Sequence, residues 1–311
     1  MKRLLVNDCL STLGEVTFWH RLCDWFGMEF VGGDYATLAE KAGDVARNGP
    51  ADLIIRNATW FGPMPESGRI PTIALLQDIS PDGETRKMQE SVARTSTVVF
   101  NSAFTAAQYP GITGRVIPLP IDFAVFTPQN AFACQQALSL PDGCVCWVGA
   151  SQGAAGHVKG FDTFLQIVRL NPDISFVGVF KDAAPESVPP NLRVYARLPQ
   201  ADLVKVIGAC RVGLCTSRTE SQHLAGIEMG VCGLPLVVPP VGCYWQRKDW
   251  PGCEALESTP AAFTQGIRAS IGKVAEKEKR PVSDYWRKEF DIEVVRAAWT
   301  KLVEEVECSG R

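Results

Sequence analysis

Short apolar runs alternate with segments of helical periodicity along the 311-residue chain. The runs are five to seven residues long, rich in Val, Ile and Leu, and bounded by polar or turn residues. This pattern is typical of buried strands. The predicted strands are residues 3–7, 52–56, 71–76, 97–101, 115–120, 144–149, 174–180, 192–196, 211–217 and 234–239.

Helical patterns lie between many of these runs. Residues 15–26 repeat apolar or aromatic side chains at helical spacing, for example at Trp19, Leu22 and Phe26. The other predicted helices are 161–168, 201–209, about 223–231 and an amphipathic segment at 283–306. Continuous apolar strands separated by helices predict parallel sheets that are covered on both faces.

We therefore predict an α/β protein with two Rossmann-like domains facing across a cleft. The turn-rich stretch 127–142 separates them. The predicted parts are an N-terminal domain (1–128), a C-terminal domain (129–282) and a C-terminal helix (283–311) that can return to the N-terminal domain. Ligands of such sheets bind beyond the carboxyl ends of the strands, and facing halves make a cleft.

The composition is that of a soluble globular protein, with 46% hydrophobic and 21% charged residues. A net charge of −3 does not indicate a broad nucleic-acid surface. The eleven cysteines contain no CxxC and only three histidines accompany them, so we expect reduced, buried thiols and no metal site. The first apolar run stops at Asn7, unlike a signal peptide, and no apolar stretch is long enough to span a membrane. We expect a cytoplasmic protein, with peripheral membrane contact left open.

The most informative segment, residues 215–238, is predicted to fold as strand, loop, helix, turn and strand. Glu220 lies in the predicted loop and Glu228 in the helix, eight residues later. The helix N-terminus between them offers free backbone N–H groups, which suit a pyrophosphate. Carboxylates on either side can accept hydrogen bonds from sugar hydroxyls. Among 34 acidic residues this spacing alone means little, so the interpretation depends on the surrounding pattern.

The glutamate pair and the Gly-x-Pro at 233–235 resemble the glutamate motif of the GT-B glycosyltransferases of the retaining GT4 type. Other segments resemble parts of the same family in the same order, and together they cover about residues 98–244. They are 98–111 (VVFNSAFTAAQYPG), 116–128 (VIPLPIDFAVFTP), 146–165 (CWVGASQGAAGHVKGFDTFL), 198–217 and 241–244 (VGCY).

The resemblance implies a role for each matching residue. Lys159 matches the lysine that binds the donor phosphate, Glu220 the glutamate near the transferred sugar, and Glu228 the glutamate on the ribose hydroxyls. Gly14 resembles a glycine that approaches the phosphates from the other half. The loop whose backbone holds the phosphates matches Gln222, His223 and Leu224. Ordinary alternatives are a turn glycine for Gly14 and an exposed surface lysine for Lys159.

The sequence departs from the family pattern at two sites, a phosphate-binding arginine and a histidine of the N-terminal half. Ala150 and Ser151 stand where the family usually has an arginine, and Arg218 or His157 is the candidate substitute. Asp78 stands where the N-terminal half commonly offers a histidine. It is predicted either to bind sugar or acceptor hydroxyls or to cap a helix or turn.

The resemblance implies a retaining hexosyltransferase that moves a sugar from a nucleoside-diphosphate sugar, UDP-sugar above all, to a hydroxyl acceptor. Lys159 and the helix N-terminus would stabilise the leaving diphosphate. No cofactor or metal is expected, and the chain has no Asp-x-Asp pair. Two alternatives are another nucleotide-sugar enzyme, such as an epimerase or phosphorylase, and a non-catalytic binding module. The acceptor stays open among lipid, glycan, small molecule and modified nucleobase in DNA.

Overall fold

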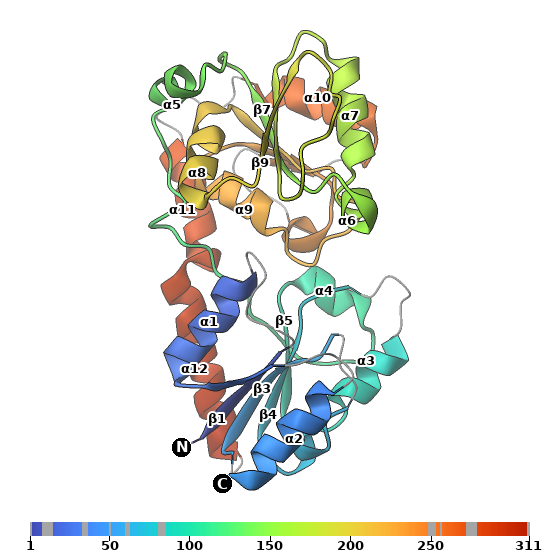
Figure 1. Cartoon of the computed structure of the whole chain (residues 1–311), viewed down its shortest axis with the longest axis vertical. Coiled ribbons are helices and arrows are strands. Elements are labelled where there is room, and N and C mark those ends of the chain that lie inside the picture. The colour runs from blue at the N-terminus through green and yellow to red at the C-terminus, as the bar shows by residue number, and fades with distance from the viewer. Residues whose placement is uncertain are drawn as a thin grey trace. The chain divides into compact units, whose positions relative to one another are not determined.

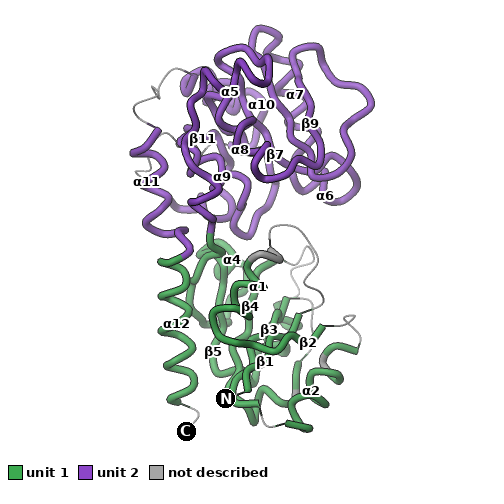
Figure 2. Tube along the Cα trace, turned by 60° about the vertical axis from the view of Figure 1, so that its left-hand side comes forward, with its two compact units in different colours: residues 1–120, 293–311 green, residues 121–292 purple. Residues whose placement is uncertain are grey.

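The structure, a computed structural model, describes residues 2–7, 15–32, 37–49, 51–59, 63–79, 85–247, 253–255, 257–271 and 279–309. The chain divides into two compact units (Figure 2). Unit 1 consists of Met1–Pro120 with Glu293–Arg311, and unit 2 is Ile121–Ile292. The boundary therefore falls at Pro120 rather than near Pro128, and the end of the chain belongs to unit 1.

Unit 1 contains a six-stranded parallel sheet in the order β2-β1-β3-β4-β5-β6 (Figure 1). Its strands are β1 (Arg3–Val6), β2 (Glu29–Val31), β3 (Leu53–Asn57), β4 (Thr72–Leu76), β5 (Thr97–Phe100) and β6 (Arg115–Val116). Its helices are α1 (Glu15–Phe26), α2 (Leu38–Asn48), η1 (Pro65–Gly68), α3 (Thr85–Val92), α4 (Ala103–Gln108) and α12 (Ile292–Ser309).

Helices cover both faces of the unit 1 sheet. Leu4 and Ile54 are partners in the sheet and pack against α2. Helices α1 and α12 lie together on the other side of the sheet from α2 (Figure 1), where Phe18 and Trp299 bring their ring centroids to 5.8 Å. The returning helix α12 thus completes the core of unit 1.

Unit 2 contains a second six-stranded parallel sheet, in the order β12-β11-β10-β7-β8-β9. Its strands are β7 (Val145–Gly149), β8 (Phe176–Phe180), β9 (Leu192–Ala196), β10 (Val212–Leu214), β11 (Leu236–Val238) and β12 (Cys253–Ala255). Its helices are α5 (Ala131–Leu138), α6 (Gly153–Val158), α7 (Phe161–Leu170), α8 (Gln200–Ala209), α9 (Leu224–Val231), η2 (Gly242–Tyr244), α10 (Pro260–Ser270) and α11 (Lys279–Phe290).

The unit 2 sheet is also buried on both faces. Alternate strand residues such as Cys146 and Val177 pack against α8, α9 and α11. Their neighbours Trp147 and Phe176 pack against α7 and α10. The Trp147 ring stacks on Phe164 of α7 with centroids 4.7 Å apart. Two parallel sheets sandwiched by helices confirm the predicted α/β class.

All ten predicted strands are present, whereas the short strands β2 and β12 carry too little pattern to have been predicted. The prediction of a single helix over 283–306 is wrong. It is two helices, α11 and α12, that meet at Asp291. Ile121 forms a parallel bridge with Asp291, and its N–H donates to the carbonyl of Phe290 at 2.8 Å. This long-range contact interrupts a segment whose local periodicity is continuous.

None of the helices that the structure describes is long and apolar enough to cross a membrane.

The packing of α12 predicts the effect of truncating Trp299, whose side chain is completely buried. Trp299→Ala leaves a cavity in unit 1, and we expect a loss of about 3–5 kcal/mol in the free energy of unfolding, measured by urea denaturation. The matched control on the same helix is Val294→Ala, because Val294 is 44% exposed. We expect the control to change stability by less than about 0.5 kcal/mol. Equal effects of the two variants would contradict this packing.

Candidate functional site

Glu220 lies in the loop that connects β10 to α9, and two donors hold one of its carboxylate oxygens. Lys159 Nζ donates to Oε1 at 2.5 Å, and Ser217 Oγ donates to the same atom at 2.7 Å. Burial of Glu220 acts to raise its pKa, but the attraction of Lys159 and the hydrogen bonds outweigh burial, and the pKa is lowered. Glu220 is therefore an ionised carboxylate at neutral pH.

The backbone at Lys159 is held by the Thr216 side chain, from the loop after β10. Thr216 Oγ1 lies 3.0 Å from the carbonyl oxygens of both Lys159 and Gly160, and Trp147 Nε1 donates to Thr216 Oγ1 at 2.9 Å. Gly160 has φ +65°, and a Cβ there would lie 2.0 Å from Thr216 O. Only glycine satisfies both the positive φ and this close approach.

His223 is the N-cap residue of α9 and has φ 73°, in the left-handed region. Its imidazole Nδ1 lies 2.7 Å from the Tyr244 hydroxyl, and Nε2 lies 3.9 Å from Glu220 Oε1. Burial lowers the pKa of His223 to about 4, although Glu220 opposes the shift. The imidazole is neutral at physiological pH, so its contact with Glu220 is not an ion pair.

The start of α9 presents free backbone donors. The first N–H groups of a helix have no partner within it. The amides of Gly226 and Ile227 both donate to His223 O at 3.2 Å. Those of Leu224 and Ala225 have no acceptor in the described part of the chain. These donors, at the positive end of the helix dipole, suit an anion.

Glu228 lies further along α9 and has the opposite protonation state to Glu220. The residue is partly buried, and among the described residues its carboxyl group makes neither a hydrogen bond nor an ion pair. Burial raises its pKa to about 8. Without a ligand, Glu228 is therefore mostly protonated at pH 7.

Comparison with known proteins identifies the architecture. No family model matches the chain. Sucrose-phosphate synthase from Thermosynechococcus elongatus superposes with a TM-score of 0.84 over 99% of this chain and 100% of that one, at 13% identity. The chain has the GT-B fold. The Anabaena protein HepE, solved with UDP and glucose, superposes with a TM-score of 0.73 over 98% of this chain and 100% of its own, at 15% identity.

Sequence relatives of this GT-B chain are glycosyltransferases. D-inositol 3-phosphate glycosyltransferase from Thermobifida fusca is 25% identical over 218 residues, 59% of this chain and 50% of that protein. The enzyme of the same name from Segniliparus rotundus is 26% identical over 142 residues, 41% of this chain and 32% of that protein. The chain thus matches at most half the length of these curated relatives.

Arg218, the predicted donor-binding cation of this GT-B chain, is engaged elsewhere. Its guanidinium donates to both carboxylate oxygens of Asp162 on α7, at 2.9 and 2.6 Å, and also to the carbonyl of His157. Its backbone N–H donates to Val158 O at 2.8 Å. Arg218 therefore fastens the loop after β10 to α6 and α7, and it could reach a ligand only by leaving Asp162.

The loop after β7, where the family usually has its arginine, is held by a carboxylate. Asp182 accepts hydrogen bonds from the backbone amides of Ser151 and Gln152, at 2.9 and 2.8 Å, and from Ser151 Oγ at 3.2 Å. Asp182 thereby occupies amides that would otherwise be available to an anion. In the part of the chain that the structure describes, Lys159 carries the positive charge that pairs with Glu220.

Two predicted residues belong to unit 1. Asp78 follows β4 and is partly buried, and its carbonyl accepts a hydrogen bond from the Tyr109 hydroxyl at 2.8 Å. Because α3 begins at Thr85, Asp78 is not the N-cap of that helix. Gly14 lies outside the described residues. The structure thus brings together Lys159, Glu220 and the start of α9, while the role of Asp78 stays a prediction.

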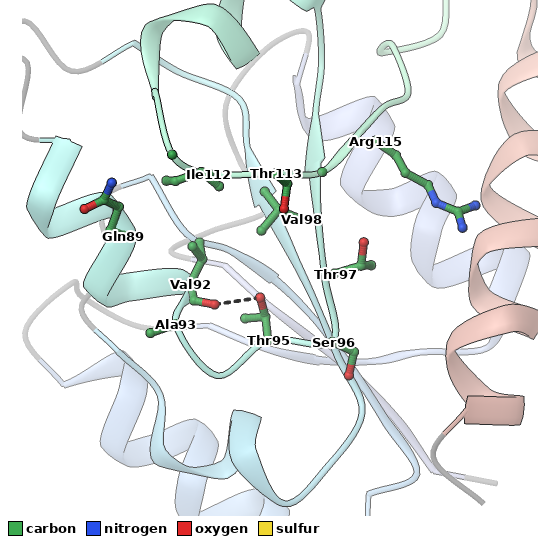
Figure 3. A pocket seen from close by; sticks show the side chains of 12 residues that line it. Gln89, Val92, Ala93, Thr95, Ser96, Thr97, Val98, Ile112, Thr113 and Arg115 are labelled. Atoms are coloured by element: carbon green, nitrogen blue, oxygen red, sulfur yellow. Dashed lines mark hydrogen bonds between the residues drawn. The ribbon is translucent and has the colours of Figure 1, made fainter.

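Two cavities lie at the amino ends of strands, one in each unit. One, of about 460 Å³, is lined by residues such as Ser96, Thr97 and Arg115 at the beginnings of β5 and β6 (Figure 3). The other, of about 400 Å³, lies at the beginnings of β7, β8 and β9. Neither contains a predicted site residue, and ligands of such sheets bind at the carboxyl ends.

Two further residues of the site were missed by sequence reasoning. Ser217 bonds Glu220, and Tyr244 bonds His223. Ser217 ends the predicted strand 211–217 and precedes Glu220 by three residues, a spacing that favours a local hydroxyl–carboxylate contact. Tyr244 lies in a segment that resembles the family, but its contact with His223 depends on the tertiary fold.

The Lys159–Glu220 pair predicts a pH-dependent change in stability. Lys159→Met leaves the buried carboxylate of Glu220 without its cation, and we expect a loss of about 1–3 kcal/mol near pH 7. Because the pKa of Glu220 is lower in the folded than in the unfolded protein, its ionisation stabilises the wild-type fold at pH values above the unfolded-state pKa. This contribution disappears as the pH falls through the folded-state pKa. The loss measured by urea denaturation should therefore shrink as pH is lowered from 7 towards 4.

The matched control is Arg218→Met, because the Arg218–Asp162 pair is exposed. We expect it to cost less than about 1 kcal/mol, with weak pH dependence. A Lys159→Met variant that matches this control at every pH would contradict the proposed electrostatic coupling.

Proposed function

We propose that this GT-B chain is a retaining glycosyltransferase of the GT4 type. In this proposal it transfers a hexose from a UDP-sugar to a hydroxyl acceptor, without a divalent metal or other cofactor. The observation that carries the proposal is the ion pair of Lys159 with Glu220, which precedes α9. Glu228 lies within α9, and its carboxyl group has no partner among the described residues. The sequence relatives named as glycosyltransferases support it.

The diphosphate of the donor is the natural partner of Lys159 and the α9 amides. Lys159 is 32% exposed while it bonds Glu220, so its ammonium group can reorient towards a phosphate oxygen. The free amides of Leu224 and Ala225 add fixed donors with no charge to desolvate. Together they stabilise the negative charge that develops on the leaving nucleoside diphosphate, and this stabilisation needs no metal ion.

Glu228 is the proposed partner of the ribose hydroxyls. A carboxylate accepts two hydroxyl hydrogen bonds well, whereas a protonated carboxyl group is a weaker acceptor. Because its pKa is raised to about 8 in the free protein, ligand binding at neutral pH should release a proton from Glu228. Burial thus holds this carboxyl group neutral until the ligand supplies donors.

Retention of anomeric configuration fits the chemistry of this site. In the GT4 type, the departing phosphate itself can take the acceptor proton, so no separate base is required. Glu220 is ionised and already bonded to Lys159, which suits it to position the sugar rather than to take that proton.

UDP and glucose are the first donor components to test, because HepE was solved with UDP and with UDP-glucose. The acceptor is a hydroxyl compound of a class still to be found: a lipid, glycan, small molecule or modified nucleobase. Asp78 is our candidate for contact with acceptor or sugar hydroxyls. The name of the curated relatives includes an inositol phosphate, which makes it one acceptor to test.

A thermal-shift screen followed by a hydrolysis assay tests the proposal. We expect UDP or UDP-glucose to raise the melting temperature more than UMP or uridine does, because the diphosphate engages Lys159 and α9. Slow release of free sugar from the stabilising donor supports transfer. Formation of an epimer would instead indicate an epimerase, and binding without turnover a binding module. If no nucleoside diphosphate or its sugar stabilises the chain, the proposal is wrong.

The raised pKa of Glu228 predicts how donor affinity depends on pH. In the wild type, the Kd for UDP-glucose should fall as pH rises from 6 to 8, by at most about tenfold per pH unit, because binding removes one proton. Glu228→Gln cannot ionise, so its Kd should be flat over this range and about ten- to a hundredfold higher than wild type at pH 8. Isothermal titration calorimetry in buffers of different ionisation enthalpy measures both the affinity and the released proton.

Glu228→Gln should weaken donor binding but should not destabilise the ligand-free protein. The pKa of Glu228 is higher in the folded protein than in the unfolded protein, so the folded state binds its proton more tightly. The free energy of unfolding of the wild type therefore falls as the pH rises towards about 8. Free Glu228→Gln should therefore be at least as stable as wild type at pH 8, which separates lost binding from lost folding. A pH-independent wild-type Kd would contradict the assignment of Glu228.

A further inference from the structure

The backbone of His223 is an outlier that calls for an explanation. Four non-glycine residues of the described chain have positive φ: Ser139, Arg197, His223 and Gln246. Of these, only His223 is buried, at 4% exposure. A non-glycine residue at φ 73° is strained, and such strain tends to be retained at functional sites. Glycine would fit this backbone better, so the imidazole side chain itself needs a reason.

The imidazole has one bonded and one uncommitted nitrogen. Nδ1 is 2.7 Å from the Tyr244 hydroxyl, while Nε2 is 3.9 Å from Glu220 Oε1, too far for a hydrogen bond. Nε2 has no other hydrogen-bond partner among the residues that the structure describes. The side chain is 2% exposed, and Nε2 is the ring nitrogen on the side of the Glu220 carboxylate.

Electrostatics favour one tautomer of His223. A nitrogen lone pair facing the Glu220 carboxylate would be repelled, whereas an N–H dipole is attracted. Nε2 therefore carries the proton, and Nδ1 accepts a hydrogen bond from Tyr244 Oη. Because the depressed pKa keeps the ring neutral, His223 presents a neutral donor beside an anionic acceptor.

The surrounding sequence leaves room for this arrangement. A Cβ at Gly226 would lie 1.8 Å from the Tyr244 hydroxyl and 2.3 Å from His223 Nδ1. A Cβ at Gly242 would lie 3.1 Å from Cβ of Glu220. Small residues therefore let the His223–Tyr244 pair and the Glu220 loop approach one another.

The spacing suits a single hydroxyl group. Two atoms 3.9 Å apart can both lie at about 2.8 Å from one shared oxygen, which would accept from Nε2–H and donate to Glu220. In the free protein, Lys159 and Ser217 fill the lone pairs of Oε1. When Lys159 turns to a phosphate, Oε1 gains a position for that hydroxyl.

We propose that His223 Nε2 and Glu220 together bind one hydroxyl of the transferred sugar, with Tyr244 as the positioning residue that fixes the imidazole. The inference rests on the proposed function. It gives the His223 side chain a role in sugar recognition, whereas the resemblance implied only that the His223 backbone holds the phosphates. The His223–Glu220 pair then selects donors by the presence and configuration of one hydroxyl group. A site that bonds a hydroxyl discriminates strongly against an analogue that lacks it.

The test uses His223→Gly, since glycine retains the left-handed backbone of the phosphate loop while removing the imidazole. We expect UDP to bind this variant within about twofold of wild type, and UDP-glucose to bind about tenfold more weakly, with a larger fall in kcat/KM. Tyr244→Phe should show a smaller loss of the same kind. Ser139→Gly is the matched control, because it relieves a positive φ of 52° at the end of α5. It should leave both ligands unaffected.

Deoxy donors identify the hydroxyl. Wild type should discriminate against one of the 2-, 3-, 4- and 6-deoxyglucose forms of UDP-glucose by tenfold or more, and His223→Gly should lose most of that discrimination. If the variant binds UDP-glucose like wild type, or discriminates among the deoxy donors equally, the inference is overturned while the proposed function stands. If neither UDP nor UDP-glucose binds wild type, both are overturned.

Discussion

The ion pair between Lys159 and Glu220 is the contact on which the arrangement of the unit 2 site depends. It joins the loop before α7 to the loop after β10, which are 61 residues apart in the chain. A buried carboxylate is costly unless it is paired, and here the pair outweighs burial, so that Glu220 stays ionised. Thr216 and Gly160 fix the backbone beneath the pair, and no residue with a Cβ could replace Gly160 without moving that backbone.

Two glutamates eight residues apart have opposite protonation states because their surroundings differ. Glu220 has a cation and a hydroxyl as partners, whereas Glu228 is desolvated without either. The free amides at the start of α9 lie between them in sequence. The free site thus combines an anion held by its own lysine, a protonated carboxyl group and unfilled donors. A ligand bearing both a diphosphate and hydroxyls would complement all three.

Likeness to solved structures lies in the fold rather than in the sequence. Likeness to sucrose-phosphate synthase extends over almost the entire chain at 13% identity, because a parallel sheet between helices tolerates many combinations of apolar residues. The polar contacts of the site, in contrast, depend on individual residues of this chain. Asp182 holds the loop in which the family usually has an arginine, and Arg218 is bonded to Asp162. Among the described residues, Lys159 is the cation that pairs with Glu220.

The sequence by itself determined the α/β class, ten of the twelve described strands, and the placement of Glu220 in a loop and Glu228 in the following helix, because apolar periodicity and turn residues act locally. Only the tertiary structure decided which side chains meet. It divided the last predicted helix at Asp291, committed Arg218 to α7, and brought Tyr244 to the His223 ring. The raised pKa of Glu228 likewise depends on what buries the carboxyl group. Such neighbours come from distant segments, and no local pattern records them.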